Sequence, residues 1–156
     1  MTIRQATDSD FDSLLELKLL CKEDEFRLSP NLKPPRETRE YYAHYLRQHL
    51  AGSRSAAFVA LEDGRLVAMI QARVYQAIPI MKFAQTGYLS NLYVLEPYRR
   101  RGIGTQLVER AVGWLREQGV SVVSLEIHVA NRAAIDLYRK AGFEDYTVKM
   151  SRRLPP

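Results

Sequence analysis

A short basic segment containing two glycines is the part of this sequence that most directly indicates chemistry. It reads Arg99-Arg100-Arg101-Gly102-Ile103-Gly104-Thr105, and helical apolar spacing begins directly after Gly102. The first N–H groups of a helix have no acceptor within the helix, and the helix dipole adds positive potential there. Glycine lets the backbone approach a bulky anion closely. The pattern therefore favours a site that holds a diphosphate on backbone amides.

Two well-known phosphate loops do not fit this segment. A nucleotide-hydrolase P-loop ends on a lysine followed by a hydroxyl residue, whereas Gly104 is followed by Thr105 and Gln106. The segment also lacks the three spaced glycines of the dinucleotide fingerprint, and no later acidic residue is placed for the ribose. A helix start whose arginines are only solvated, and which binds no ligand, would show the same residues. The segment alone leaves this plainer interpretation open.

Proton-transfer chemistry has three candidates further along the chain. Glu126 and His128 alternate with apolar residues in Ser124–Val129, so a strand places both polar side chains on one face. Tyr138 follows in a helical pattern, where spacing alone favours a tyrosine packed in the core. For Glu126, the plainer interpretation is a glutamate paired with a nearby arginine or lysine. Spacing alone therefore assigns a catalytic role to neither residue.

These segments lie in the second half of the chain, where strands and helices alternate. Strands are expected at Gly87–Val94 and at the β-branched run Val120–Val129, which reads as buried. A helix with one apolar stripe is expected between them, starting after Gly102. A further helix, capped by Asn131 and ended by Gly142, should follow. The strand–helix–strand order predicts a right-handed parallel crossover.

The first half of the chain predicts antiparallel strands and two helices. In order, we expect a strand at Ile3–Ala6, a helix capped by Thr7 with Asp10 and reaching about Lys22, a helix at Glu37–Leu50, and strands at Ala56–Leu61 and Leu66–Val74. Glu62–Arg65 should form the tight turn of the hairpin. We expect Glu23-Asp24-Glu25 in a turn after the first helix and a last strand at Tyr146–Arg152. No element is assigned to Gln76–Thr86.

Length and composition favour a single globular domain, residues 1–156, of mixed α/β (α+β) class. The expected architecture is a central, mostly antiparallel sheet with one parallel strand–helix–strand crossover and flanking helices. There is no long apolar run and no signal-peptide pattern, so we expect a cytoplasmic protein with no membrane partner.

Metal and nucleic-acid chemistry are not indicated. The three histidines have no cysteine or carboxylate at ligand spacing, so no metal site is predicted. Cys21 is the single cysteine, which excludes an intrachain disulfide and reads as a packed core thiol. A net charge of +5, with basic residues mostly interleaved with acids, fits a local anion site better than a nucleic-acid surface.

Two segments together resemble the core of the GNAT N-acetyltransferase superfamily. One is Asn91-Leu92-Tyr93-Val94 followed by the run Pro97–Gly104, in which Arg99, Gly102 and Gly104 match the family's spaced pattern of a basic residue and two small ones. The other is Asn131–Phe143, in the expected order and separation. The match covers about Gly87 to Phe143, whereas Cys21–Gln85, the region that usually shapes the acceptor pocket, carries no family signature.

The resemblance implies acetyl-CoA as co-substrate and assigns its contacts. The pyrophosphate is expected on the segment Arg99–Thr105, so Arg99, Arg100, Arg101, Gly102, Ile103, Gly104 and Thr105 are cofactor-binding candidates. The pantetheine arm is expected beside the backbone of Leu92, Tyr93 and Val94, with an amide near Val94 polarising the thioester carbonyl. Asn131 is expected to contact the same arm, which enters where the strands ending near Val94 and Val129 splay apart.

The resemblance also implies roles in catalysis. Tyr138 occupies the position of the family's tyrosine that protonates the departing CoA sulfur. Glu126 is the candidate base, because some members, including ribosomal-protein N-terminal acetyltransferases, use a glutamate in a matching place. His128 is an alternative base, and a chain of waters is another. The acceptor is expected to be a primary amine of a small molecule or a peptide N-terminus.

Two other functions, a sensor module and a nucleic-acid-binding protein, are compatible with parts of this sequence. A sensor module that binds acyl-CoA without turnover fits the same phosphate segment, and labelled acetyl transfer separates it from an enzyme. A nucleic-acid-binding protein would use the arginine triplet and leave the second matched segment unexplained.

Glu23–Glu25 could attract a cationic amine or form a solvated acidic turn, and Tyr41, Tyr42 and Tyr45 could line the acceptor mouth or pack between helices. Edge-strand pairing makes a homodimer possible.

Overall fold

The computed structural model describes residues 1–29 and 31–155 of the chain. Within them the centre is a five-stranded sheet with the strand order β1-β2-β3-β4-β5. The strands are β1 Thr2–Gln5, β2 Ser55–Glu62, β3 Arg65–Gln76, β4 Gln85–Val94 and β5 Val123–Ser124. Strands β1 to β4 pair antiparallel, whereas β4 and β5 pair parallel. The expected mixed, mostly antiparallel sheet is confirmed.

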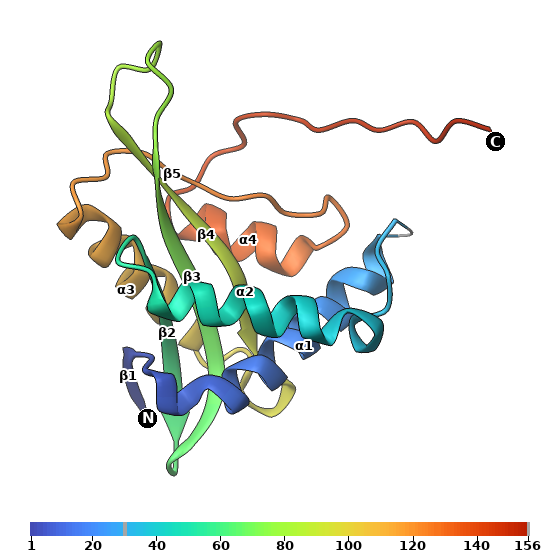
Figure 1. The fold of residues 1–156 in the computed structure, drawn as a ribbon, viewed down its shortest axis with the longest axis vertical. Helices are drawn as coiled ribbons and strands as arrows, with labels where there is room; N and C mark the ends of the chain where they lie inside the picture. Colours follow the sequence, from blue (N-terminus) through green and yellow to red (C-terminus); the bar gives the residue numbers. More distant parts are fainter. Residues whose placement is uncertain (30, 156) are drawn as a thin grey trace.

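Helices cover both faces of this sheet. They are α1 Phe11–Leu28, α2 Arg39–Ala51, α3 Ile103–Glu117 and α4 Arg132–Lys140, with short 3-10 turns at Asp8–Asp10, Pro35–Thr38 and Glu96–Tyr98. Figure 1 shows α1 and α2 in front of the sheet and α3 and α4 behind it. Because β4, α3 and β5 follow one another, with β4 and β5 parallel, the predicted crossover is present.

Strand alternation divides the core into two layers. On β2, Phe58 and its neighbours Ala56 and Ala60 face α3, whereas Val59 faces the layer of α1 and α2. The ring of Trp114 on α3 meets the ring of Phe58 edge to face, with centroids 6.3 Å apart. Successive side chains of a strand point to opposite faces, so one apolar run serves both layers.

Several local signals in the sequence are confirmed. Asp63 and Gly64 have φ angles of 50° and 78°, as a two-residue hairpin turn between β2 and β3 requires. The N–H of Thr7 donates to Asp10 Oδ2 at 2.8 Å, which is half of the predicted capping interaction. Asn131 Oδ1 accepts from the N–H of Ala134 at 3.2 Å and caps α4.

The end predicted for the first helix was wrong. Helix α1 continues to Leu28, so Glu23, Asp24 and Glu25 lie within it and not in a turn. The sequence from Phe11 to Leu28 contains no glycine or proline that would break a helix. Ion pairs between Lys22 and Glu25, at 2.7 Å, and between Arg27 and Asp24, at 3.1 Å, join successive turns.

The long strand predicted at Val120–Val129 is reduced to the two residues of β5. Its alternation persists, because Val123, Leu125 and Ile127 are partly buried against the core. Val129, however, is 69% exposed and does not belong to a buried strand. β5 pairs with β4 only at Gly87 and Tyr88, and an apolar pattern alone cannot form a strand where no neighbour is in reach.

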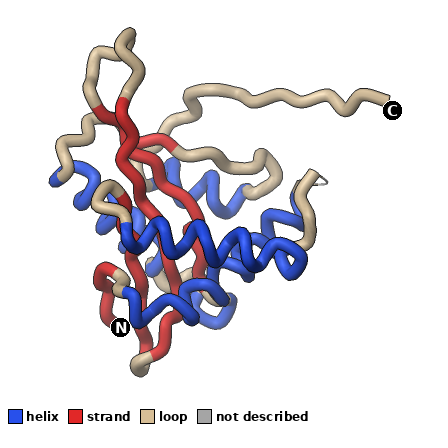
Figure 2. The backbone as a smooth tube through the Cα atoms, viewed as in Figure 1, coloured by secondary structure: helices blue, strands red, loops and turns tan. Residues whose placement is uncertain are grey.

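The last strand predicted at Tyr146–Arg152 is absent from the structure. Among residues 144–155 the chain has no helix or strand, and it extends away from the body as a tan tube (Figure 2). Tyr146, Val148 and Met150 are each more than four-fifths exposed. Alternation favoured a strand, but the segment has no paired neighbour.

Candidate active site

The start of α3 presents backbone N–H groups without helical acceptors. Gly102 caps the helix at a φ of 76°, and the N–H of Gln106 is the one that bonds back to its carbonyl. The N–H groups of Ile103, Gly104 and Thr105 therefore have no acceptor within the helix. Together with the positive end of the helix dipole, they form a site suited to an anion.

The arginine side chains before α3 are partly occupied elsewhere. Arg99 Nε donates to the carbonyl of Val94 at 2.9 Å, and its Nη2 lies 3.4 Å from Asp24 Oδ2. Arg101 pairs with Glu62 at 2.7 Å. Arg100 is exposed and has a φ of 63°. The backbone of this segment is thus better placed for an anion than the guanidinium groups of Arg99 and Arg101.

The packing of α3 gives a second reason for glycine at position 104, besides the anion site that its sequence position predicts. A β-carbon at this position would lie 2.8 Å from Leu137 Cδ1 on α4. The missing side chain therefore lets α3 and α4 pack closely. At Gly102, by contrast, a β-carbon would meet open space, and the positive φ is what requires glycine.

The edge of β4 beyond Tyr88 has no paired strand on its β5 side among the described residues. The N–H of Leu95 donates to Val67 of β3, so by strand alternation the backbone groups of Leu92 and Val94 point toward the open edge. The Sγ atom of Cys21 lies 4.0 Å from the carbonyl oxygen of Leu92. This open edge runs toward the start of α3 and can accept an extended chain.

Tyr138 lies on the inner side of α4, where it is only 6% exposed. Its ring meets Phe143 edge to face, with centroids 5.4 Å apart. Burial raises the pKa of its hydroxyl, and the nearby Cys21 and Tyr88 raise it further. The hydroxyl therefore remains protonated at neutral pH, as a proton donor must.

Glu126 and His128 lie in the irregular segment after β5 and are both exposed. The side chain of Glu126 is 72% exposed and 4.0 Å from Lys149 Nζ. His128 Nδ1 accepts from the N–H of Ala130 at 3.1 Å. The ion pair with Lys149 agrees with the plainer interpretation of Glu126, and its assignment as base stays a prediction.

A buried polar cluster between α1 and the sheet was missed from the sequence. Lys18 Nζ donates to Gln71 Oε1 at 3.0 Å, and Asn91 Nδ2 donates to the same oxygen at 2.5 Å. Lys18 and Gln71 are 6% and 2% exposed. The available signal was Gln71, a polar residue within the apolar run of β3. The burial of Lys18 depends on how α1 packs against the sheet, and no pattern in the sequence indicated it.

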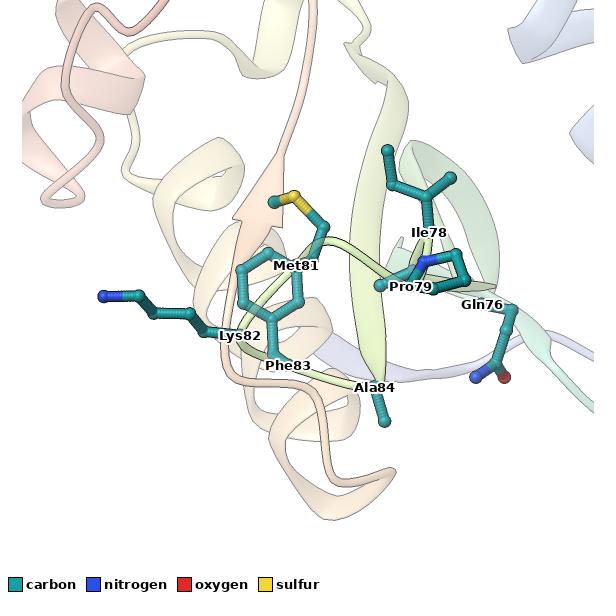
Figure 3. Close-up of a pocket in the computed structure, with 8 residues that line it drawn as sticks. Gln76, Ile78, Pro79, Met81, Lys82, Phe83 and Ala84 are labelled. Carbon is teal, nitrogen blue, oxygen red and sulfur yellow. The ribbon is translucent and has the colours of Figure 1, made fainter.

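One open pocket lies in the loop between β3 and β4. It measures about 530 Å³ and is lined by residues 76–79 and 81–84. Figure 3 shows that the labelled side chains of Ile78, Lys82 and Ala84 point in different directions. It shares no residue with the α3 start or the open edge of β4.

Among residues 1–29 and 31–155, no three His, Cys, Asp or Glu side chains are grouped as metal ligands would be. None of the helices in the same residues combines the length and apolarity needed to cross a membrane.

Known proteins with similar sequences and folds are acetyltransferases. Residues 14–143 match the model of the Acetyltransferase (GNAT) family. The N-alpha-acetyltransferase of Sulfurisphaera tokodaii is 31% identical over 94% of this chain and 81% of its own length. The [ribosomal protein bS18]-alanine N-acetyltransferase of Escherichia coli K12 is 30% identical over 63% of this chain and 61% of its own. A predicted acetyltransferase from Clostridium acetobutylicum, solved with acetyl-CoA, shares the fold with a TM-score of 0.78 at 21% identity, covering 97% of this chain and 95% of that one.

Proposed function

Since the chain belongs to the GNAT acetyltransferase family, we propose that it transfers the acetyl group of acetyl-CoA to the α-amine of a peptide or protein N-terminus. The observation that carries this proposal is the open edge of β4 leading to the unpaired amides at the start of α3. The acceptor class is supported by the names of the Sulfurisphaera and Escherichia relatives.

The chain's own groups fit the parts of acetyl-CoA. The amides of Ile103, Gly104 and Thr105 suit the diphosphate, and exposed Arg100 adds a nearby positive charge. The edge of β4 suits the amide-containing pantetheine arm. Asn131 uses its Oδ1 to cap α4, so its Nδ2 remains free to donate to that arm. When bound, acetyl-CoA supplies an acyl group activated as a thioester.

Three groups share the chemistry. The N–H of Val94 points to the open edge and polarises the thioester carbonyl. Tyr138, kept protonated by burial, donates a proton to the departing CoA sulfur. Glu126, His128 or water takes the proton that the attacking amine loses. The C–N bond forms first and places negative charge on the thioester oxygen, and the C–S bond then breaks, so the N-acetylated amine and the CoA thiol are the products.

Direct transfer is favoured over an acyl-enzyme on Cys21. This thiol is 7% exposed, and burial raises its pKa to about 12. The thiolate is the nucleophilic form of cysteine, and little of it is present at neutral pH. We therefore propose that the amine attacks acetyl-CoA within a ternary complex.

An acceptor screen tests this function. Labelled acetyl-CoA is incubated with the protein and peptides that begin with Ala, Ser or Met, and the products are located by mass spectrometry. Matched peptides with a blocked N-terminus and an internal lysine serve as controls, together with a polyamine and an aminoglycoside. We expect label on free N-termini. Label confined to the small amines would move the acceptor class, and binding without transfer to any amine would favour the sensor.

A further inference from the structure

Lys18 is a buried cation without an anionic partner. It lies on α1 and is 6% exposed, and its one polar contact is the neutral Gln71. No carboxylate in the described parts of the chain lies within ion-pair distance of its Nζ, whereas Lys22 on the next turn pairs with Glu25. Lysine is rarely buried unless it is paired. The missing anion can therefore be one that exists only during function.

The cluster that holds Lys18 leads to the open edge of β4. Gln71 Oε1, on β3, accepts from both Lys18 and Asn91, which places the ammonium next to the Asn91 side chain of β4. Asn91 has a φ of 52° at an irregularity of the β3–β4 register, and it directly precedes Leu92. One turn after Lys18, Cys21 Sγ lies 4.0 Å from the Leu92 carbonyl. This stretch of α1 thus faces the part of β4 assigned to the pantetheine arm, two residues before Val94, whose N–H is assigned to the thioester.

The surroundings leave the ammonium charged at neutral pH. The pKa of Lys18 is lowered to about 8, mainly by burial and in smaller part by the charges of Lys22 and Arg73, while Cys21 and Glu25 act in the opposite sense. From α2, His49 also faces this region. Burial lowers the pKa of His49 to about 4, so its ring is neutral wherever Lys18 titrates. Two cations around a buried ammonium would favour a negative charge placed nearby.

We propose that the Lys18 ammonium, held against β4 by Gln71 and Asn91, stabilises the negative charge that develops on the thioester oxygen during acetyl transfer. This inference rests on the proposed function. The oxygen gains charge as the amine attacks and loses it when the C–S bond breaks, so a fixed nearby cation lowers the barrier in between. In a dry site such a charge acts over several ångströms without direct contact.

Lys18→Met tests the proposal, because methionine fills the space of the lysine stem. We expect kcat to fall on the order of tenfold or more at neutral pH, with unchanged acetyl-CoA affinity by calorimetry. Thermal stability should stay equal or rise, because a buried charge is removed. A merely structural role predicts lower stability instead. Arg27→Met removes a cation from an exposed position of the same helix and should leave kcat unchanged.

The pH dependence gives a second readout. The ratio of parent to Lys18→Met kcat cancels the titration of the amine substrate. It should be largest below the Lys18 pKa of about 8 and decline above it, as the parent loses its ammonium. A ratio that stays flat from about pH 7 to about pH 9.5 would overturn the proposal.

Gln71→Glu separates charge from hydrogen bonding. The new carboxylate keeps Lys18 in place but neutralises its charge, so kcat should fall as it does in Lys18→Met. Full activity in this variant would contradict an electrostatic role. A change confined to the KM of acidic peptides would make Lys18 a reader of the acceptor instead. If the parent protein transfers no acetyl group, the proposed function itself is refuted. If the parent and Lys18→Met are equally active, the proposed function stands and the role of Lys18 is refuted.

Discussion

Gly104 on α3 faces Leu137 on α4 so closely that a β-carbon at position 104 would lie 2.8 Å from Leu137 Cδ1. Two helices that carry different parts of the proposed site, the start of α3 and Tyr138 on α4, therefore depend on one glycine for their spacing. Tight packing of this kind tolerates added volume poorly.

Gly104→Val should therefore destabilise the fold as well as weaken acetyl-CoA binding. Overpacking a core contact costs about 1–3 kcal/mol, measurable as the free energy of unfolding in denaturant. Gly113→Val, on the same helix, is the matched control. A β-carbon placed at position 113 would have no neighbouring atom within 4 Å. Equal stability of the two variants would show that α4 moves to accommodate the side chain.

Tyr138→Phe should slow turnover on the order of 10²–10⁴-fold while acetyl-CoA affinity is nearly kept. We propose that the hydroxyl acts on the departing sulfur, so the loss belongs to the transition state. The phenylalanine ring keeps the contact with Phe143, and the melting temperature should change little. A core role alone predicts the reverse: nearly normal kcat, with stability lost if a polar partner is orphaned.

Glu126→Gln should lower kcat most at low pH, where deprotonating the amine is hardest. Lys149→Met is the matched control, because it breaks the ion pair but keeps the carboxylate. A pH–rate profile of Glu126→Gln that overlays the parent's would remove Glu126 as base. His128→Ala, measured in parallel, then tests the alternative.

Asp10 should make stability depend on acid. Its hydrogen bonds with Arg4 lower the pKa of Asp10 to about 2, helped by the N–H of Thr7. Because the folded pKa lies below the ordinary value, this stabilisation is present above about pH 4 and is lost as the pH falls toward 2. Asp10→Asn should cost about 1–2 kcal/mol at neutral pH, and this cost should shrink as the pH falls through about 2.

The control for Asp10 is Asp8→Asn, at an exposed position of the same turn. Unfolding curves at several pH values are compared for the parent and both variants. An Asp10→Asn protein whose stability still falls as steeply as the parent's between about pH 4 and 2 would place the acid sensitivity elsewhere.

Sequence patterns predicted the features that are set locally. The turn at Asp63-Gly64, the Asn131 cap and the apolar stripe of α3 each depend on residues a few positions apart. The spacing after Gly102 likewise predicted the start of a helix there, because the glycine conformation and the helix pattern coincide.

Features set by distant partners were not predictable in this way. Val120–Val129 and Tyr146–Arg152 have strand-like alternation, but a strand forms only where a neighbour pairs with it. The burial of Lys18 depends on α1 packing against β3, fifty-three positions away in sequence at Gln71. A polar residue in an apolar strand was the one local trace of that cluster.

Backbone NMR titration with acetyl-CoA tests the central claim, that the start of α3 and the open edge of β4 bind the co-substrate. We predict that the largest amide shifts fall on Ile103, Gly104 and Thr105 and on Leu92 to Val94. Acetyl-pantetheine, which lacks the diphosphate, should shift the β4 amides and spare those of α3. Shifts concentrated in another region, such as the β3–β4 loop, with the α3 amides unchanged, would contradict the claim.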